Sequence, residues 1–548
     1  MKTRGPASIT LPAGFCLTPD PGCRQLDETT LFGGSPARVL RLSGAGAAAL
    51  AELRSGPVRS RAAGTLARRL TDAGLAHPHP PELAARPDVT VLIPARDRPV
   101  LLDRCLAALG SGYPVLVVDD GSADPAAVAA VAAAHQARLL RRPASGGPGA
   151  ARNAGLAGVT SDLIAFLDSD CVPEPGWIER LAAHLADPAV AAAAPRIVPL
   201  TAGPGAGRWA SRYTAACSCL DLGGQPARVA PGRRVGYVPT AALVVRRAAL
   251  AGLARPDAVF DPGLRWGEDV DLIWRLHAAG WRIRYEPAAR VGHHEPASWT
   301  GLLARRFRYG TSAGPLGRRH PGAVAPLALH PWPALTVAAL LAGHPAVAGA
   351  GLAGSVLAMR VTLRRAGLPA RGVLPAMLTA TRQTWLGAGR YATQFAAPLL
   401  AGAVLAGRAA PAGRHWPGRA LPPGAAAARR VLATGPGHPA ARWWRRAAAA
   451  SLLLGPPLAA WLARRPALDP ARFTAAWLAD DIAYGAGVWA GAVRARTAAP
   501  VRPVIAWRPL GRLTPVGAPA PGSAGSPSTG APATGAPATG PAISGAEG

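Results

Sequence analysis

Two carboxylates one residue apart, Asp168 and Asp170, follow the apolar run 163–167. An apolar run of this length is typical of a buried strand, and ligands of open α/β sheets bind at the carboxyl ends of strands. Paired carboxylates at such an edge can hold a hard divalent cation, which in turn can hold a diphosphate. Most Asp-x-Asp triplets are turns or caps, so this interpretation depends on the residues around it.

A second acidic pair, Glu268 and Asp269, comes directly after Gly267 and begins a segment with helical spacing. A carboxylate at the start of a helix can act as a general base, although acids in a first turn also simply balance the helix dipole. Further along the chain, a neutral imidazole at His293 could complete a cation site. The two acidic pairs together indicate a metal-assisted reaction with a separate proton acceptor.

The elements that must position these acids are visible upstream. Strand patterns at 89–95 and 115–120 enclose a segment with helical spacing at 101–109, which predicts a right-handed parallel crossover. The second strand ends in Asp119 and Asp120, which could accept hydrogen bonds from a base or ribose, or could simply cap an Asp-Gly turn.

A glycine-rich loop at 146–155 then opens a helix that carries Arg152 and Asn153. Helix N-termini and nearby arginines suit anionic groups. The loop has neither the Lys-Ser/Thr pair of a P-loop nor the glycine spacing of a dinucleotide fingerprint, which disfavours both of those classes.

In this order, the motifs resemble those of inverting family 2 glycosyltransferases with the GT-A fold. They lie at 91–97 (VLIPARD), 117–122 (VVDDGS), 147–155 (GPGAARNAG), 168–170 (DSD), 267–272 (GEDVDL) and His293. The resemblance implies an α/β fold, with helices on both faces of a mostly parallel sheet, over an expected domain at 86–310. It also implies a nucleotide-sugar donor and Mn²⁺ or Mg²⁺ as cofactor.

The resemblance also implies roles for single residues. Those expected to bind the donor or the acceptor sugar are Pro94, Arg96, Asp120, Arg152, Asp168 and Trp266, with Asp120 on the uracil and Trp266 against a sugar face. Those expected at the metal are Asp168, Asp170 and His293. Asp269, next to Glu268, would deprotonate the acceptor hydroxyl. A Gln-x-x-Arg-Trp motif, common in processive synthases of this family, is missing, and 305–309 (RRFRY) does not replace it.

Residues 1–85 form a small N-terminal unit in this interpretation. A strand pattern at 37–43 precedes helical spacing at 47–53 and 65–73, and Gly74 is placed to end the second helix. The order resembles winged-helix domains that recognise ribosomally made peptides; a plain extension of the catalytic domain is the alternative.

The whole layout resembles the glycosyltransferases of mycofactocin systems. That resemblance implies transfer of a hexose, glucose from UDP-glucose, to a redox cofactor derived from a short peptide, with growth of a short β-1,4 oligosaccharide. Two alternatives stay open: a membrane-associated transferase that makes cell-envelope glycan or glycolipid, and a non-enzymatic peptide-binding scaffold.

The charge of the chain is basic and uneven. Lys and Arg outnumber Asp and Glu by 60 to 30, and no acidic residue occurs from Pro296 to Leu468. We expect no nucleic-acid partner, because no binding motif accompanies the arginines. Apolar stretches alternate with them at 320–359, 395–407 and 447–463, and tryptophans and arginines flank the last of these. An Ala/Arg-rich helical region at 311–510 is therefore expected at an anionic membrane surface.

The remaining features set limits on the protein's surroundings. The first thirty residues lack the apolar core of a secretory signal, which predicts an active site at the cytoplasmic face of the cell membrane. The six cysteines show no zinc-ligand spacing and are expected to be reduced thiols. Residues 511–548, rich in Pro, Gly and Ala, are expected to be a disordered tail.

Overall fold

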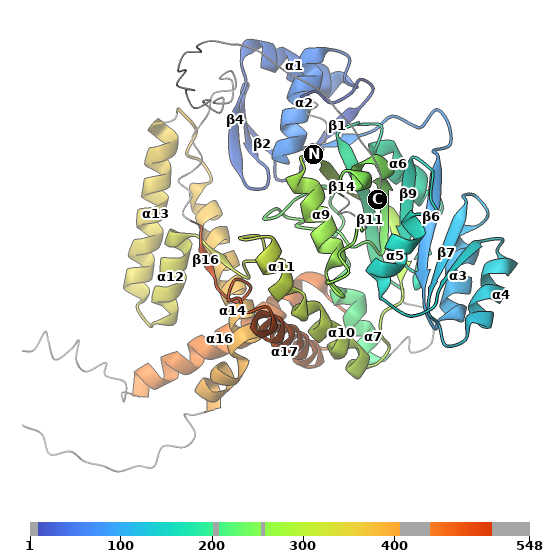
Figure 1. The fold of residues 1–548 in the computed structure, drawn as a ribbon. Coiled ribbons are helices and arrows are strands. Elements are labelled where there is room, and N and C mark those ends of the chain that lie inside the picture. The colour runs from blue at the N-terminus through green and yellow to red at the C-terminus, as the bar shows by residue number, and fades with distance from the viewer. Residues whose placement is uncertain (1–8, 201–207, 254–257, 366, 406–438, 507–548) are drawn as a thin grey trace, which may run out of the picture.

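The computed structural model describes residues 9–200, 208–253, 258–365, 367–405 and 439–506. The expected tail at 511–548, the residues before Ile9 and the end of the apolar stretch 395–407 lie outside these ranges. Within them the chain forms a small N-terminal unit, a central α/β domain and a C-terminal helical bundle (Figure 1).

The central domain is built on a nine-stranded mixed sheet in the order β10-β14-β11-β13-β9-β6-β7-β8, with β12 added beside β14. Its strands are β6 (Val89–Ala95), β7 (Val115–Asp120), β8 (Arg138–Arg142), β9 (Leu163–Leu167), β10 (Cys171–Pro173), β11 (Val190–Pro199), β12 (Ala227–Val229), β13 (Ala242–Arg246) and β14 (Arg282–His293). The predicted strands at 89–95, 115–120 and 163–167 are confirmed as β6, β7 and β9, and they run parallel.

Antiparallel strands that the sequence analysis did not predict complete the sheet. β13 runs antiparallel to β9 and β11, and β10 and β12 run antiparallel to β14. The parallel part therefore covers β8, β7, β6 and β9 and, on the other side of β13, the pair β11 and β14. Because β6, β7 and β9 are parallel, their carboxyl ends bring residues 96–97, 120 and 168 to one edge.

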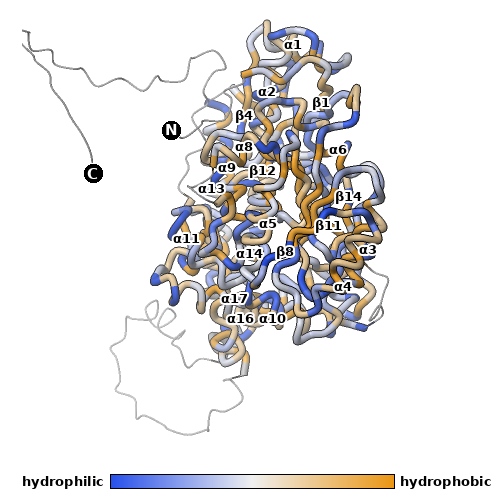
Figure 2. Tube along the Cα trace, turned by 45° about the vertical axis from the view of Figure 1, so that its right-hand side comes forward, coloured by the Kyte–Doolittle hydropathy of each residue, from blue (hydrophilic) through white to orange (hydrophobic). Residues whose placement is uncertain are grey.

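Helices cover both faces of this sheet, as expected. The helices are α3 (Pro99–Leu109), α4 (Pro125–Ala134) and α6 (Trp177–His184) on one face, and α5 (Pro148–Leu156), α8 (Arg247–Ala251) and α9 (Glu268–Ala278) on the other. Two apolar cores result, one on each face of the sheet, and the most hydrophobic part of the trace follows the strands around β11 (Figure 2). The short α7 (Trp209–Cys217) contacts β11.

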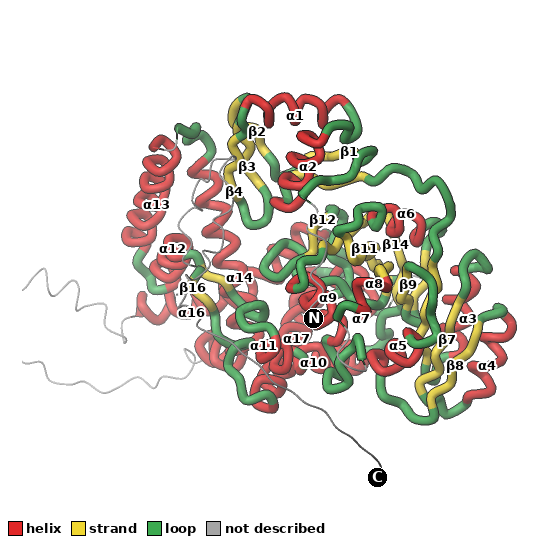
Figure 3. Tube along the Cα trace, turned by 45° about the horizontal axis from the view of Figure 1, so that its top comes forward, coloured by secondary structure: helices red, strands yellow, loops and turns green. Residues whose placement is uncertain are grey.

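The N-terminal unit has its own core around Phe15 and Leu66, and it sits beyond the β11–β14 side of the sheet (Figure 3). It contains β1 (Cys16–Pro19) paired with β5 (Ala76–His79), the sheet β2 (Arg24–Asp27), β3 (Thr30–Gly33) and β4 (Arg38–Arg41), and helices α1 (Gly44–Ser55) and α2 (Arg61–Ala73). Gly74 ends α2 in the left-handed conformation, as the sequence predicted.

The C-terminal bundle comprises α10 (Trp299–Thr311), α11 (Ala313–Arg319), α12 (Pro331–Leu341), α13 (Pro345–Arg365), α14 (Val373–Leu405), α16 (Pro439–Arg464) and α17 (Pro470–Arg494), with a short pair of β15 (Ala328–Leu329) and β16 (Val504–Ile505). α10 lies before the expected boundary at residue 310 but packs along α17. Pro331 and Pro345 each begin a helix, where proline is tolerated because its missing N–H has no partner to lose.

Candidate active site

The predicted pair Asp170 and His293 meets at the end of two antiparallel strands. β10 pairs with β14 so that Cys171 lies opposite His293, and the His294 N–H donates to the Asp170 carbonyl at 2.9 Å. The register leaves Asp170 Oδ1 3.6 Å from His293 Nε2. His293 is 4% exposed. Burial lowers its pKa, but the charges of Asp170 and Glu295 outweigh burial and leave the pKa raised.

These two side chains have the donor types that a divalent cation uses beside a diphosphate. Within the described ranges, no group of three His, Cys, Asp or Glu side chains is close enough to hold a metal ion by itself. Mg²⁺-type sites commonly take one or two protein ligands and complete their shell with phosphate oxygens and water, so a pair suffices. The other Asp170 oxygen accepts from Arg98 Nη1 at 3.0 Å.

The third predicted ligand, Asp168, is held by a buried arginine. Arg152 Nη2 donates to Asp168 Oδ1 at 2.6 Å, and Arg152 Nη1 donates to Glu268 Oε1 at 3.0 Å. Arg152 is 2% exposed and its guanidinium lies 5.6 Å from the centre of the Phe260 ring. One guanidinium thus links the Asp-Ser-Asp turn at the end of β9 to the first residue of α9. Asp168 stays a predicted metal ligand.

Glu268 and Asp269 are adjacent in sequence but differ in their surroundings. Burial and the Asp269 charge raise the pKa of Glu268 to about 7, against the opposing effect of Arg152. Asp269 is less buried, and within the described chain its carboxylate accepts one hydrogen bond, from the Val270 N–H at 2.7 Å. Burial also raises the pKa of Asp269. Asp269 therefore has a free carboxylate oxygen, whereas Glu268 is committed to Arg152.

The turn before α9 depends on Gly267. This residue has φ 79°, a left-handed conformation that glycine adopts without strain, and a Cβ there would lie 2.8 Å from the Ser312 Cβ. The turn presents Glu268 inward toward Arg152 and leaves Asp269 on the cavity wall.

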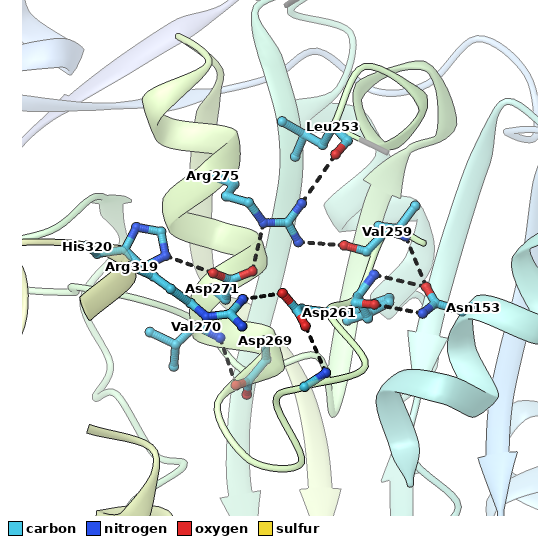
Figure 4. A network of polar contacts seen from close by, with 12 residues as sticks. Asn153, Leu253, Val259, Asp261, Asp269, Val270, Asp271, Arg275, Arg319 and His320 are labelled. Carbon is cyan, nitrogen blue, oxygen red and sulfur yellow. Dashed lines mark hydrogen bonds and ion pairs between the residues drawn. The ribbon is translucent and has the colours of Figure 1, made fainter. Parts of the chain in front are cut away.

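A second polar network holds α9 in place behind Asp269 (Figure 4). Asp271 accepts from Arg275 Nε at 2.7 Å and lies 2.8 Å from His320 Nε2, just after α11. Asn153 receives the Val259 and Phe260 N–H groups on its Oδ1 and donates to the Phe260 carbonyl at 2.7 Å. The motif at 147–155 therefore contacts α9 directly through Arg152 and Glu268, and indirectly through Asn153 and Val259, whose carbonyl accepts from Arg275.

On the predicted nucleoside side, Asp120 serves the glycine-rich loop. Its carboxylate accepts from Ser145 Oγ at 2.9 Å, from the N–H groups of Gly146 and Gly147 at 3.1 and 2.8 Å, and from Arg142. Arg96, half-exposed beyond the end of β6, donates from Nη1 to Ser145 Oγ at 2.9 Å. Pro94 lies on β6 as expected. The uracil contact of Asp120 stays a prediction, and its hydrogen bonds to the loop are an additional finding.

A cavity of about 740 Å³ adjoins these residues. The predicted residues Arg152, Asp168, Trp266, Glu268, Asp269 and His293 line it. Trp266 makes an edge contact with Tyr309, their ring centres 6.2 Å apart. Asp120 is not among the residues that line the cavity, which adjoins the Asp168, Asp269 and His293 side of the predicted site.

Part of this wall comes from residues that sequence reasoning missed. Arg306 and Tyr309 from α10, Arg390 and Gln394 from α14, and Trp477, Asp480 and Tyr484 from α17 also line the cavity. Asp480 is buried and accepts from Arg306 Nε at 2.5 Å. A signal existed: Asp480 and Asp481 are buried acids that follow a region of more than 170 residues free of acids, from Pro296 to Leu468.

Comparison with known proteins bears directly on this site. Residues 90–250 match the family described as Glycosyl transferase family 2. The pre-mycofactocin glycosyltransferase of Mycobacterium tuberculosis is 39% identical over 505 residues, which cover 90% of this chain and 98% of the relative. Succinoglycan biosynthesis protein ExoO of Rhizobium meliloti is 31% identical over 39% of this chain and 63% of its own length.

Among solved structures, the mannosyltransferase PcManGT of Pyrobaculum calidifontis, in complex with GDP-Man and Mn²⁺, covers 69% of this chain and 88% of its own. Its sequence identity is 19% and the TM-score is 0.35, too low to support inferences about ligands here.

The match to the Mycobacterium tuberculosis relative covers 90% of this chain and so extends well beyond the catalytic domain, and the family match contains the predicted strands, the glycine-rich loop and the Asp-Ser-Asp turn. The chain is a nucleotide-sugar-dependent member of glycosyltransferase family 2, close to the pre-mycofactocin glycosyltransferases.

Proposed function

We propose that this enzyme transfers glucose from UDP-glucose, with inversion, to a peptide-derived redox cofactor of the mycofactocin type, and that it extends the product as a short β-1,4 oligosaccharide. The name and the near full-length match of the Mycobacterium tuberculosis relative support the acceptor class. The arrangement of Asp168, Glu268 and Asp269 supports inversion at the anomeric carbon.

One observation carries the inverting mechanism: Asp269 is the single acid of the 268–269 pair that is not tied to Arg152. Retaining hydrolases use a second carboxylate about 5 Å from the first as nucleophile. Here Asp168 and Glu268 both bind the same buried guanidinium and are held away from a nucleophile's role.

The reaction can then be written with these residues. The acceptor hydroxyl gives its proton to the free oxygen of Asp269 as its own oxygen bonds to the anomeric carbon, and the bond from that carbon to the diphosphate oxygen breaks. A divalent cation at Asp170 and His293 would neutralise charge on the departing diphosphate, an effect usually worth several kcal/mol. Arg152 keeps Asp168 and α9 in register during the displacement.

The Asp269→Asn variant tests this proposal. We expect transfer to fall by about 10²- to 10⁴-fold, the usual contribution of a general base, with UDP binding nearly unchanged. Product formation is measured by mass spectrometry and UDP binding by calorimetry. Asp124→Asn is the matched control, because Asp124 caps α4 away from the cavity and Asn caps equally well. Unchanged transfer by Asp269→Asn contradicts the assignment.

We also propose that the bundle binds the cytoplasmic face of the cell membrane. Two helices of the described chain, Pro345–Arg365 and Trp443–Arg464, are long and apolar enough to cross a bilayer, and only 11% and 17% of their apolar windows are buried. Leu357 and Leu399 are 63% and 77% exposed. The surrounding region has arginines and no acids, which suits anionic lipid. α12 and α13 stand at the outer edge of the molecule in Figure 1.

Vesicle flotation of the full chain tests the membrane proposal. Binding to phosphatidylglycerol vesicles that survives 1 M salt and fails in the double variant Leu357→Glu, Leu399→Glu supports apolar docking. Binding that salt abolishes indicates arginine contacts alone, and no flotation rejects the proposal. The same exposed helices favour the alternative acceptor, a cell-envelope glycan or glycolipid. Recovery of the glycosylated acceptor only from the lipid fraction would support this alternative.

A further inference from the structure

The cavity at Asp269 extends well past the catalytic residues, to a wall made by the C-terminal bundle. Arg390 and Gln394 lie on this wall from α14, Arg464 from α16, and Trp477 and Tyr484 from α17. The volume of about 740 Å³ falls in the upper part of the range for ligand pockets and leaves room for more than the single acceptor hydroxyl that the reaction needs.

The side chains of this wall are held in fixed positions. The guanidiniums of Arg390 and Arg464 lie over the Trp477 ring, 5.5 and 5.4 Å from its centre. The buried Asp481 accepts from Arg390 Nε at 3.1 Å and from Gln394 Nε2 at 2.9 Å. Arg464 Nη1 contacts Cys217 Sγ at 2.8 Å. An aromatic ring with positioned planar donors beside it is therefore present before any ligand binds.

Much of the hydrogen-bonding capacity of these donors is unused. Arg390 is half-exposed and, in the described part of the chain, donates from Nε alone, so its four other N–H groups can reach a ligand. The combination suits a pyranose, because its hydroxyls can accept from the guanidinium and amide groups that Trp477 and Asp481 hold in place. A purely apolar ligand would leave these charged groups desolvated and unpaired.

We propose that Trp477, Arg390, Gln394 and Arg464 form a glycan subsite that binds a sugar already attached to the acceptor. The inference rests on the proposed function, because it assumes a β-1,4-linked product. With the previous sugar held on the bundle wall, the next hydroxyl lies toward Asp269.

Calorimetric titration of the full chain with cellobiose and cellotetraose tests the subsite, since both contain β-1,4-linked glucose. We expect both to bind, with the longer one tighter, and maltotetraose, its α-linked isomer, to bind weakly. Trp477→Ala should weaken cellotetraose binding about fivefold to tenfold, the range expected when Arg390 and Arg464 lose the ring that positions them. Trp477→Phe should retain most of the affinity, and Arg464→Gln should reduce it.

The control variant is Trp443→Ala, because Trp443 is 64% exposed on α16 and does not line the cavity. Circular dichroism melting of each variant identifies unfolding, and Trp477→Phe and Arg464→Gln keep the test valid if Trp477→Ala does not fold. Failure of the wild-type chain to bind cellotetraose while it binds UDP overturns the subsite alone.

Equal affinity for the α- and β-linked tetramers, or equal binding by all Trp477 and Arg464 variants, also overturns the subsite and would indicate that the wall serves the unglycosylated acceptor. If the wild-type chain binds neither UDP nor cellotetraose, the result instead counts against the proposed function itself.

Discussion

At the scale of single residues, the site separates two neighbouring acids by what they contact. Arg152 binds Glu268 and Asp168, so both carboxylates are fixed, whereas Asp269 keeps an oxygen free at the cavity wall. Removing Arg152 would leave the buried Glu268 and the partly exposed Asp168 without their shared partner. Arg152, which the sequence suggests as a binder of anionic ligands, thus links the Asp-Ser-Asp turn to the first residue of the helix that carries Asp269.

The pH profile of transfer follows from the environment of Asp269. Burial raises its pKa, the Asp168 charge adds to this, and Arg152 and the Val270 N–H oppose it; Tyr237 and Tyr309 also face it. A base works only when deprotonated, so kcat should fall as pH drops through this raised pKa, above the ordinary Asp value of 3.8.

The measurement is kcat from pH 4 to pH 9 for wild type and Glu268→Gln. The variant removes the carboxyl group whose pKa is about 7. If kcat of Glu268→Gln still falls at low pH, the group that must be deprotonated is Asp269. If the fall at low pH disappears in this variant, that group is Glu268.

At the scale of elements, glycines of α17 allow its backbone to lie in close contact with the backbone of α10. A Cβ at Gly487 would lie 2.0 Å from the Phe307 carbonyl oxygen, and one at Gly491 would lie 2.3 Å from that of Thr311. Because these neighbours are backbone atoms, no rotamer change can make room. The close approach places Trp477 and Asp480, both on α17, on the cavity wall.

Gly487→Ala should therefore push α17 away, with a loss of about 1–3 kcal/mol of stability and slower transfer. Gly354→Ala is the matched control: it lies on α13, its Cβ would meet no atom within 4 Å, and alanine favours a helix by about 0.5–1 kcal/mol. Thermal unfolding and transfer rates are measured for both variants. A neutral Gly487→Ala would show that the helices can separate at no cost.

At the scale of the whole molecule, one buried and one partly buried ion pair join the N-terminal unit to the catalytic domain. Arg68 on α2 donates to both oxygens of Asp187 at 2.6 and 2.7 Å, and Asp72 accepts two hydrogen bonds from Arg282 at 2.8 Å. Arg284 is buried beside them, and its three guanidinium nitrogens have no partner among the described residues. The unit is a fixed part of the enzyme, so truncation would expose these charges.

Asp187→Asn should cost about 3–5 kcal/mol, because it leaves the Arg68 charge buried without its partner. Urea unfolding of the full chain measures the change. The double variant Arg68→Met, Asp187→Leu should recover most of the loss, since apolar residues of similar size can replace a buried pair. Equal stability of Asp187→Asn and wild type would mean that the two units do not unfold together.

The interface also predicts acid sensitivity. Burial opposes ionisation of Asp72, but Arg282 and Arg228 outweigh it and lower its pKa. A lowered pKa contributes stability that is present above the ordinary Asp value of 3.8 and is lost as pH falls below it.

The sequence by itself determined the parallel strands β6, β7 and β9, the helix α9 and the candidate acids, because apolar periodicity and glycine placement are local properties. It also indicated the family, through six short motifs in order. Only the tertiary structure decided that Arg152 binds Glu268, that Asp120 accepts hydrogen bonds from the glycine-rich loop, and that α14 and α17 complete the cavity. Those contacts join residues from 22 to over 200 positions apart, and alanine-rich helices carry little pattern to say which face packs where.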